Sequence, residues 1–489
     1  MSQAKSIDHV IKALPKLQSR YNIFAHLEPS TKILQRYNDI QKNQPNSTLA
    51  GTISAIKDNI VTQDSNTTCA SQMLKEYKSP FTATIVKLLS NAGTTIVGKT
   101  NMDEFAMGSL GIHSCYGPTI NPSRAFFAND DMGKREMVTG GSSSGSAAAV
   151  SATIDGDNII DFALGTDTGG SVRLPASYCS VLGFKGSYGR ISRYGVVSFA
   201  QSLDTVGIFA KDLPILRGVF DVLNKYDRKD PTSLNDLLRN EIIELSDKCL
   251  HRLQNPLRIG IVQEFNQESV DKDIKSAFHD FIGQLMEKGY TVVPISIPSI
   301  KYSLPIYYTL APSEAVSNLS RYDGIRFGTR DPNEDVNNEA FFSKTRSNFG
   351  TEVRNRLILG NYNLSSSFAH NNYIQAQKLR VNLINEFDFM FKFPNVLTRN
   401  KANVGDDNGI DFIISPTSLN KPTFVRRAMS DKIATDEYFN DIFTIPASLA
   451  GLPTMTIPIR GNEPIGIQIM GQYGDDQGVL DFTSTLMKK

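Results

Sequence analysis

The sequence predicts an α/β protein in which helices cover a mixed or parallel central sheet. Segments with helical periodicity alternate with short apolar runs along the chain, as expected for this fold class. No repeat of fixed period is visible, and no long linker rich in proline or serine divides the chain. With 489 residues, of which 40% are hydrophobic and 21% charged, the chain can bury a large core. We therefore expect one large domain spanning residues 1–489.

Two helix-and-strand units show this alternation. Residues 81–92 place apolar side chains at helical spacing, and residues 94–97 follow as a predicted buried strand. Farther along, residues 257–262 are predicted to form a strand, and a helix with one apolar face follows and ends at Gly289. Residues 290–297 then form the next predicted strand. Both units favour helices packed on a sheet.

The N-terminal residues 1–48 are predicted to form a helical segment ahead of the main body of the fold. Residues 1–25 are basic, and their apolar side chains fall on one helical face until Pro15, which is expected to interrupt the helix. A short basic amphipathic stretch is typical of an organelle-targeting signal, but it also suits an ordinary surface helix. These residues leave both alternatives open, and contact with a partner is a further use for the segment.

Composition excludes several classes of protein. The chain has 51 Lys and Arg against 50 Asp and Glu, which argues against binding nucleic acid mainly through its own phosphate contacts. No apolar run approaches the ~20 residues that a membrane-spanning helix needs. The four cysteines form no CxxC pair and the six histidines no HExxH or HxH pair, so we expect no metal site. The cysteines are interpreted as buried free thiols in a reducing compartment.

Two glycine- and serine-rich segments, residues 140–150 and 165–173, are the most unusual features of the chain. A flexible linker is disfavoured, because an alanine-rich helix and an apolar strand at residues 159–164 follow directly. A phosphate-binding loop is also disfavoured, because the Lys-Ser/Thr ending of that motif is absent. Nucleophilic catalysis by a serine remains as the third interpretation.

That serine could be activated by either of two bases. Residues 141–145 match the GxSxG nucleophile elbow centred on Ser143, and three histidines lie downstream. The elbow needs an apolar strand before it, however, and residues 131–136 are mostly charged. The alternative base is a lysine, Lys57, which follows the short apolar pair Ala55-Ile56. Alone, Lys57 would be interpreted as a solvated lysine at a strand end.

The chain resembles the amidase signature family from about residue 50 to about residue 480. The stretch Gly-Gly-Ser-Ser at residues 140–143 is common to many such amidases. Two longer stretches resemble more narrowly the branch that supplies ammonia for tRNA-dependent amidation: Asn-Met-Asp-Glu-Phe-Ala-Met-Gly at 101–108 and Asn-Leu-Ser-Arg-Tyr-Asp-Gly-Ile-Arg at 318–326. The resemblance implies the amidase signature fold, a mixed central sheet covered by helices on both faces, with residues 49–489 as the catalytic part.

The resemblance also implies a triad of Lys57, Ser142 and Ser171. Lys57 would be the base, Ser142 a bridging serine held by a cis peptide bond, and Ser171 the acyl-ester nucleophile. A serine hydroxyl is a weak nucleophile and needs an adjacent base. A lysine serves only when neutral, so its pKa must fall from ~10.4 toward 7–8.

Further site residues follow from the same resemblance. The backbone N–H groups of Thr168, Gly169 and Gly170 would form the oxyanion hole. The glutamine substrate would be bound by Tyr307, Arg356 and Asp441, with Arg356 on its α-carboxylate and Asp441 on its α-ammonium. The alternative for each of the last three is a surface salt bridge, and Arg354 and Tyr308 stand close to them in sequence.

The implied function is hydrolysis of L-glutamine, with ammonia passed to a B-type partner subunit that uses ATP and Mg2+ to convert Glu-tRNA(Gln) into Gln-tRNA(Gln). This chain would hold no cofactor, would contact tRNA mainly through the partner, and would not insert into a membrane. The alternatives are a stand-alone amidase acting on small amides and a non-catalytic scaffold. Intact Lys57, Ser142 and Ser171 argue against the scaffold.

The sequence departs from the family pattern in four places. Ser144 replaces a usual glycine, and residues 121–139 are longer than their counterpart. An excess near residues 155–161 predicts an enlarged turn between helix and strand. The N-terminus before Lys57 is shorter than in bacterial relatives, which resembles the fungal mitochondrial form, where a small F-type subunit takes the place of the C-type one. We therefore expect a mitochondrial matrix protein.

Overall fold

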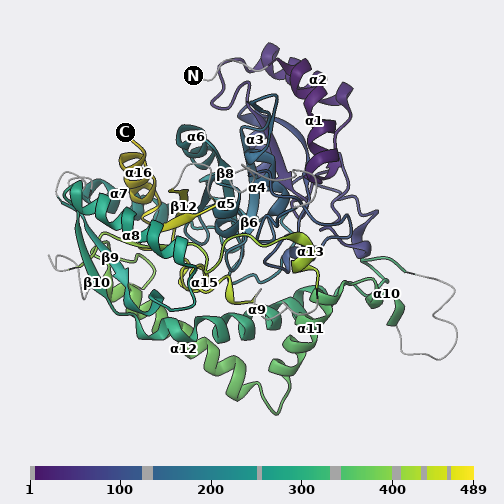
Figure 1. Ribbon diagram of the computed structural model, residues 1–489. Coiled ribbons are helices and arrows are strands. Elements are labelled where there is room, and N and C mark those ends of the chain that lie inside the picture. The colour runs from purple at the N-terminus through teal and green to yellow at the C-terminus, as the bar shows by residue number, and fades with distance from the viewer. Residues whose placement is uncertain are drawn as a thin grey trace.

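The computed structural model describes residues 6–123, 136–249, 256–330, 343–398, 409–430, 438–459 and 464–488. An eleven-stranded sheet runs through it in the order β1-β3-β2-β6-β8-β7-β12-β13-β11-β9-β10 (Figure 1). The strands are β1 (Phe24–Leu27), β2 (Ile53–Lys57), β3 (Thr95–Thr100), β6 (Phe162–Asp167), β7 (Leu182–Lys185), β8 (Thr205–Ala210), β9 (Arg258–Val262), β10 (Thr291–Ile295), β11 (Phe412–Pro416), β12 (Thr454–Pro458) and β13 (Gly466–Met470).

The sheet is parallel toward both ends and antiparallel in the middle. Strand β2 pairs in parallel with β3 and β6, and β9 pairs in parallel with β10 and β11. The strands between these groups, from β6 through β8, β7, β12 and β13 to β11, pair antiparallel. The edge strand β1 is antiparallel to β3. The prediction of a mixed sheet is therefore confirmed.

Helices cover both faces of the sheet. Alternate residues of β2 face opposite sides, so that Ala55 packs in the core beside α4 and Ile56 in the core beside α3. The first face is covered by α1 (Ile7–Tyr21), α4 (Ser144–Ser151) and α5 (Arg173–Tyr178). The second is covered by α3 (Thr84–Asn91), α6 (Leu213–Leu223), α8 (Lys272–Glu287) and α16 (Asp476–Met487).

The remaining helices lie farther from the sheet. Helices α9, α11, α12 and α15 build a third apolar core with the loops after the strands. Their bounds, with those of the other peripheral helices, are α2 (Ser30–Asn43), α7 (Asp236–Cys249), α9 (Ser303–Leu319), α10 (Ser343–Ser347), α11 (Thr351–Leu364), α12 (Gln375–Met390), α13 (Val425–Ala428) and α15 (Ile445–Leu449).

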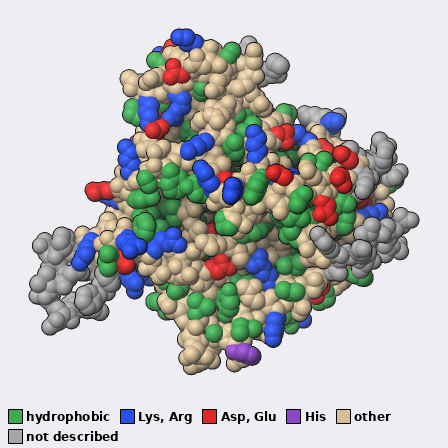
Figure 2. Space-filling model, turned by 180° about the vertical axis from the view of Figure 1, so that it is seen from behind, with side chains coloured by type: hydrophobic (Ala, Val, Ile, Leu, Met, Phe, Trp, Pro, Cys, Tyr) green, Lys and Arg blue, Asp and Glu red, His purple; other side chains and the backbone are tan. Residues whose placement is uncertain are grey.

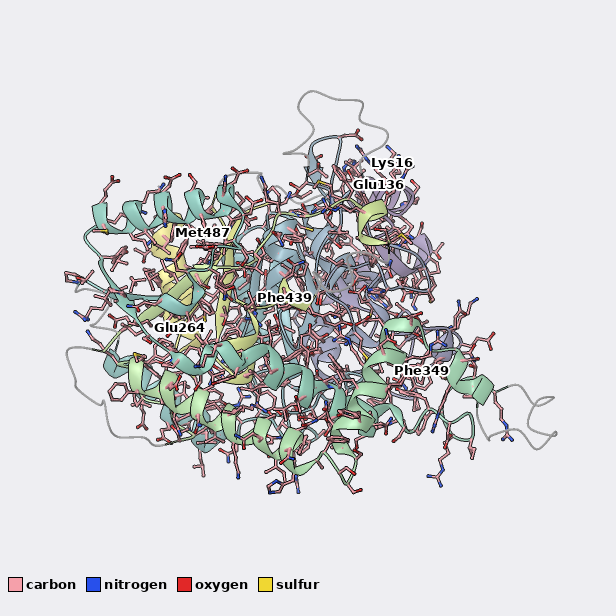
Figure 3. All side chains as sticks on the ribbon, turned by 60° about the horizontal axis from the view of Figure 1, so that its bottom comes forward. Lys16, Glu136, Glu264, Phe349, Phe439 and Met487 are labelled. Carbon is pink, nitrogen blue, oxygen red and sulfur yellow. The ribbon has the colours of Figure 1, made fainter. Side chains whose placement is uncertain are left out.

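Both predicted helix-and-strand units are present. Helix α3 and strand β3 follow one another as the periodicity indicated, and β9, α8 and β10 form the second unit. Lys16 of α1 and Met487 of α16 lie well apart, on the right and on the left of the view in Figure 3. Acidic and basic side chains are interspersed over much of the surface seen from behind (Figure 2), in keeping with the balanced charge. No helix within the described ranges is long and apolar enough to cross a membrane.

The N-terminal segment differs from the sequence prediction in two respects. Helix α1 continues through Pro15 to Tyr21 instead of stopping there. Its apolar face, including Val10 and Leu17, is buried in the core beside α4. The segment is also not wholly helical, because β1 within it extends the sheet by pairing with β3. Residues 7–27 are thus packed into the fold, as expected for its first helix and edge strand.

The excess near residues 155–161 forms the enlarged turn that was predicted. It contains a small hairpin of β4 (Thr153–Ile154) and β5 (Asp157–Asn158). Asp155 and Gly156 make its turn with φ angles of 54° and 92°. Most of the predicted insertion at residues 121–139, namely 124–135, lies outside the described residues.

Candidate active site

Lys57 ends β2, and its side chain is wholly buried. Its Nζ atom lies 2.8 Å from Ser142 Oγ and 2.9 Å from Ser143 Oγ. The same atom lies 3.0 Å from Thr166 Oγ1 on the neighbouring strand β6. Burial lowers the pKa of Lys57 to about 7, although nearby acidic groups, of which Asp103 acts most strongly, oppose this shift. Near neutral pH the amine is therefore available as a base.

The neighbours of Lys57 determine where its lone pair points. A neutral amine has two N–H donors and one lone pair. Ser143 Oγ donates its own proton to Thr166 O at 3.0 Å, so toward Lys57 it acts as an acceptor. Thr166 Oγ1 accepts from Asn59 Nδ2 at 3.1 Å and likewise accepts from Lys57. With both N–H groups directed to these acceptors, the lone pair of Lys57 faces the hydroxyl of Ser142.

Ser142 lies between Lys57 and Ser171. The backbone N–H of Ser142 donates to Ser171 Oγ at 3.4 Å, and the N–H of Ser143 donates to the Ser171 carbonyl oxygen at 3.2 Å. Ser142 is wholly buried, whereas Ser171 is half-buried and open to an approaching molecule. The three predicted triad residues are therefore brought together in series, with Ser171 at the accessible end.

The cis peptide bond expected at Ser142 is absent, because all peptide bonds between described residues are trans. The chain reverses instead at Gly140 and Gly141, whose φ angles of 72° and 59° favour glycine. A Cβ atom on Gly141 would also lie 2.5 Å from Pro175 Cδ. This part of the prediction was wrong, since two glycines supply the turn without a cis bond.

The segment of residues 168–171 directly follows β6 and contains the predicted oxyanion residues Thr168, Gly169 and Gly170 together with Ser171. Two hydrogen bonds fix this segment, one to a side chain in it and one to a carbonyl oxygen. Thr168 Oγ1 donates to Asp204 Oδ1 at 2.7 Å, and the carbonyl oxygen of Gly169 accepts from Thr444 Oγ1 at 2.7 Å. Within the described part of the chain, no residue accepts the backbone N–H groups of the last three residues of the segment. These N–H groups are available to stabilise a negatively charged oxygen.

Tyr307 and Asp441 lie against the two glycines of this segment. A Cβ atom on Gly169 would be 2.8 Å from the Tyr307 hydroxyl, and one on Gly170 would be 3.0 Å from Asp441 Oδ1. Both side chains are buried, and Ser109 Oγ donates to Asp441 Oδ2 at 2.5 Å. Two of the three predicted substrate contacts are therefore placed beside the accessible serine.

Arg356, the third predicted substrate contact, is separated from Tyr307 by the ring of Tyr308. It is buried on α11, where its Nε donates to Glu352 Oε1 at 3.0 Å. Its guanidinium carbon is 5.6 Å from the ring centroids of both Tyr308 and Tyr438, and the Tyr308 ring lies 5.1 Å from that of Tyr307. Nη2 of Arg356 has no hydrogen-bond partner among the described residues. Arg356 is thus a buried cation that forms an ion pair with Glu352 and keeps its Nη2 atom without a partner, so it is not a surface salt bridge.

A comparison with protein families shows to which family the chain belongs. The sequence model of the family described as Amidase matches residues 5–480, which include all the site residues named above. The chain belongs to the amidase family.

This amidase has close curated relatives along nearly its whole length. It is 47% identical over 482 residues to the mitochondrial A-type subunit of glutamyl-tRNA(Gln) amidotransferase from Eremothecium gossypii, covering 98% of each chain. It is 46% identical over 444 residues to the protein of the same name in Yarrowia lipolytica, covering 90% of this chain and 92% of that one. A crystal structure of the A-type subunit of this amidotransferase from Thermotoga maritima superposes with a TM-score of 0.67 at 31% identity, covering 97% of this chain and 92% of that one.

Sequence reasoning missed two residues that orient the lysine of the amidase. Asn59 and Thr166 both lie in stretches that were singled out, but no role was given to either. Their contact depends on the pairing of β2 with β6, which sets Ile56 opposite Leu164. The local sequence carries no signal for that register. The proximity of Asn59 to Lys57 in sequence was the one available indication.

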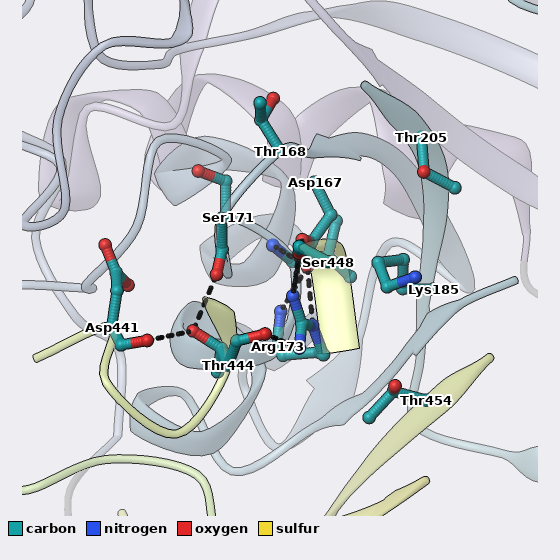
Figure 4. A network of polar contacts seen from close by, with 12 residues as sticks. Asp167, Thr168, Ser171, Arg173, Lys185, Thr205, Asp441, Thr444, Ser448 and Thr454 are labelled. Atoms are coloured by element: carbon teal, nitrogen blue, oxygen red, sulfur yellow. Dashed lines mark hydrogen bonds and ion pairs between the residues drawn. The ribbon is translucent and has the colours of Figure 1, made fainter. Parts of the chain in front are cut away.

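A buried ion pair fixes the oxyanion segment of the amidase. Arg173 donates to Asp167 from Nε at 2.9 Å and from Nη2 at 2.8 Å (Figure 4). Burial alone would raise the pKa of Asp167, but the Arg173 guanidinium outweighs it and lowers the pKa. Arg173 Nη1 donates to the Thr444 carbonyl oxygen at 2.6 Å. The same arginine therefore connects the start of the oxyanion segment to the turn that carries Asp441.

Removing this arginine is expected to destabilise the amidase strongly. In Arg173→Met the carboxylate of Asp167 stays buried without its partner, which typically costs ~3–5 kcal/mol of unfolding free energy. Urea unfolding followed by circular dichroism measures the loss. The double variant Asp167→Asn/Arg173→Met is the control and should recover part of the stability, because it buries no charge. A loss below ~1 kcal/mol in the single variant would contradict the assignment.

Proposed function

We propose that this amidase is the glutaminase subunit of a mitochondrial tRNA-dependent amidotransferase, a glutamine-hydrolysing carbon–nitrogen ligase that makes Gln-tRNA(Gln). The observation that carries the proposal is the buried amine of Lys57, which lies 2.8 Å from Ser142 Oγ, beside the accessible Ser171. The 47% identity to the mitochondrial protein of Eremothecium gossypii over nearly the whole chain supports the choice of substrate and location.

In the first half-reaction, Ser171 Oγ attacks the side-chain amide carbon of L-glutamine. Its proton passes through the Ser142 hydroxyl to Lys57. The amide oxygen becomes an oxyanion, which accepts hydrogen bonds from the backbone N–H groups of residues 169–171. Lys57 then returns a proton through Ser142 to the amide nitrogen. The C–N bond breaks, ammonia leaves, and a glutamyl ester on Ser171 remains.

In the second half-reaction, water attacks the ester carbon. Its proton passes by the same route through Ser142 to Lys57, and the same N–H groups stabilise the second oxyanion. The C–O bond to Ser171 breaks as Lys57 returns the proton to Ser171 Oγ. Glutamate leaves, and the serine and the neutral lysine are regenerated, so the cycle consumes one glutamine and one water and gives one glutamate and one ammonia.

The charged residues beside the serine suit the backbone end of glutamine. The free Nη2 of Arg356 and its tyrosine-lined surroundings suit the α-carboxylate, and Asp441 suits the α-ammonium. The Tyr307 side chain packs on Gly169, next to the accessible serine. A stand-alone amidase for uncharged amides would have no use for a buried arginine with a partnerless Nη2 and a buried carboxylate in this region.

The ammonia would pass to a B-type subunit, which would bind ATP and Mg2+ and carry most of the contact with Glu-tRNA(Gln). A small third subunit, of the fungal F-type in place of C, would complete the assembly in the mitochondrial matrix. The near balance of 51 basic and 50 acidic residues supports leaving most tRNA contact to the partner. The catalytic groups proposed for this chain are all side chains or backbone N–H groups.

The test is the formation of Gln-tRNA(Gln) by the complex reconstituted from this chain and its co-expressed partner subunits. We expect ATP-dependent product from Glu-tRNA(Gln) with either glutamine or ammonium chloride as the nitrogen donor. No product with either donor, together with hydrolysis of simple amides by the isolated chain, would favour the stand-alone amidase. Failure of a fluorophosphonate probe to label Ser171 would favour a non-catalytic scaffold.

A further inference from the structure

A groove of about 460 Å3 lies outside the active site, between the C-terminal end of α9 and the N-terminal half of α11. Its floor is apolar and is formed by Val316, Leu319, Phe349 and Leu357. Ile358 also lines the groove, and 69% of its surface is exposed. This exposed fraction is high for a large apolar side chain. Phe349 marks the groove near the junction of α10 and α11 (Figure 3).

The charged residues that line the groove are all of one sign. Arg346 and Arg354 are exposed on its rim. Among the described residues, no carboxylate lines the groove and neither guanidinium has an ion-pair partner. Two nearby acids interact electrostatically with these arginines, Asp323 with Arg346 and Glu104 with Arg354, but neither acid forms an ion pair with them within the described residues. Basic side chains also gather over the α10–α11 region in the view from behind (Figure 2). An occupant that is apolar on one face and acidic at its edges fits this lining.

The groove is connected to the triad through three consecutive residues. The Phe349 ring packs edge-on against that of Phe105 at 5.6 Å. Phe105 has a φ of 49°, an unfavourable value for a bulky residue, and its N–H donates to the Cys69 carbonyl oxygen at 3.0 Å. Two residues earlier, the N–H of Asp103 donates to the carbonyl oxygen of Ser142 at 3.2 Å. Packing at the groove therefore bears directly on the turn that supports the bridging serine.

The position of α11 indicates which partner comes here. One face of this helix carries Arg356 toward the proposed glutamine site, and the other carries Arg354 and Ile358 toward the groove. Only α11 therefore separates an occupant of the groove from the proposed glutamine site, where ammonia is released. The subunit that must receive this ammonia has to lie close to that site, whereas an unrelated partner has no such requirement.

We propose that the groove between α9 and α11 docks an acidic amphipathic segment of the ammonia-receiving B-type subunit, and that docking steadies the turn at residues 103–105. The inference rests on the proposed function and deepens it by naming a docking surface. Contact at the groove raises glutamine hydrolysis because it holds Ser142 in place between Lys57 and Ser171.

The test uses the full chain with the purified B-type subunit of the same genome. In Arg346→Glu/Arg354→Glu, the rim repels an acidic partner, and we expect the Kd to rise at least ~30-fold, as for loss of two interfacial charge pairs. Stimulation of glutamine hydrolysis by saturating partner should fall with it, while the hydrolysis rate of the isolated chain stays unchanged. Ile358→Asp tests the apolar face separately and should weaken binding in the same direction.

The control is Lys225→Glu/Arg228→Glu, which reverses two exposed charges on the loop after α6. It should bind like the wild type. Equal binding by the groove variants and the wild type would overturn the inference, and so would equal weakening in the control. Failure of the wild-type chain itself to bind the B-type subunit would contradict the proposed function instead, so the two failures are distinguishable.

Discussion

Ser171→Ala is expected to abolish glutamine-dependent formation of Gln-tRNA(Gln) while leaving the ammonia-dependent reaction intact. The variant removes the oxygen that attacks the amide, and no other hydroxyl replaces it at the accessible end of the triad. Loss of a nucleophile from a concerted set typically lowers kcat by ~10^4-fold or more. Ammonium chloride bypasses this step, because the proposed partner subunit performs the transfer to tRNA. Assays with both donors, on the complex purified through this chain, measure the two effects.

A matched serine provides the control for this result. Ser151 lies at the end of α4, where its Oγ donates to the Cys179 carbonyl oxygen at 2.7 Å. Ser151→Ala should therefore use both nitrogen donors like the wild type. A Ser171→Ala complex that still uses glutamine would show that another residue is the nucleophile. Loss of the ammonia reaction as well would place Ser171 in the assembly of the complex rather than in glutamine cleavage.

The fold could be predicted in part from local patterns. Helical spacing followed by a short apolar run correctly gave α3 with β3, and also β9 with α8 and β10. The strand order was not predictable in this way, because β6 lies between β2 and β8 through pairings that no local pattern encodes. The strand inside the N-terminal segment was missed for the same reason, since β1 is a strand only by virtue of its pairing with β3.

The candidate site shows the same division. Lys57, Ser142 and Ser171 were identified by resemblance, and the structure brings them together. The orientation of the lysine depends on Thr166, whose distance from Lys57 is set by strand register. The cis bond was wrongly expected because motif similarity carries no backbone angles, whereas Gly141 at positive φ makes the turn. Motifs therefore identified the reacting groups but not the contacts that orient them.

Lys57→Met is expected to lower kcat for glutamine hydrolysis by about 10^3-fold or more, with little change in glutamine binding. Methionine fills the buried space but cannot accept the proton that Ser142 passes on. In the wild type, burial lowers the pKa of Lys57 to about 7, so kcat/KM should rise with pH through this value and then level off. At pH 6 only about one tenth of the molecules carry the neutral amine. The variant should lose this dependence on pH.

Lys57→Arg separates the role of a base from that of a positive charge. An arginine keeps the charge but is not deprotonated in proteins, so it cannot take the proton from Ser142. If Lys57 is the base, this variant should be as inactive as Lys57→Met at every pH. If the lysine served only to stabilise negative charge near Ser142, the arginine variant would retain activity, and its kcat/KM would not change with pH near 7. Thr166→Val tests the geometry: it removes one acceptor of the amine but keeps the base, so it should reduce the rate much less than loss of the amine.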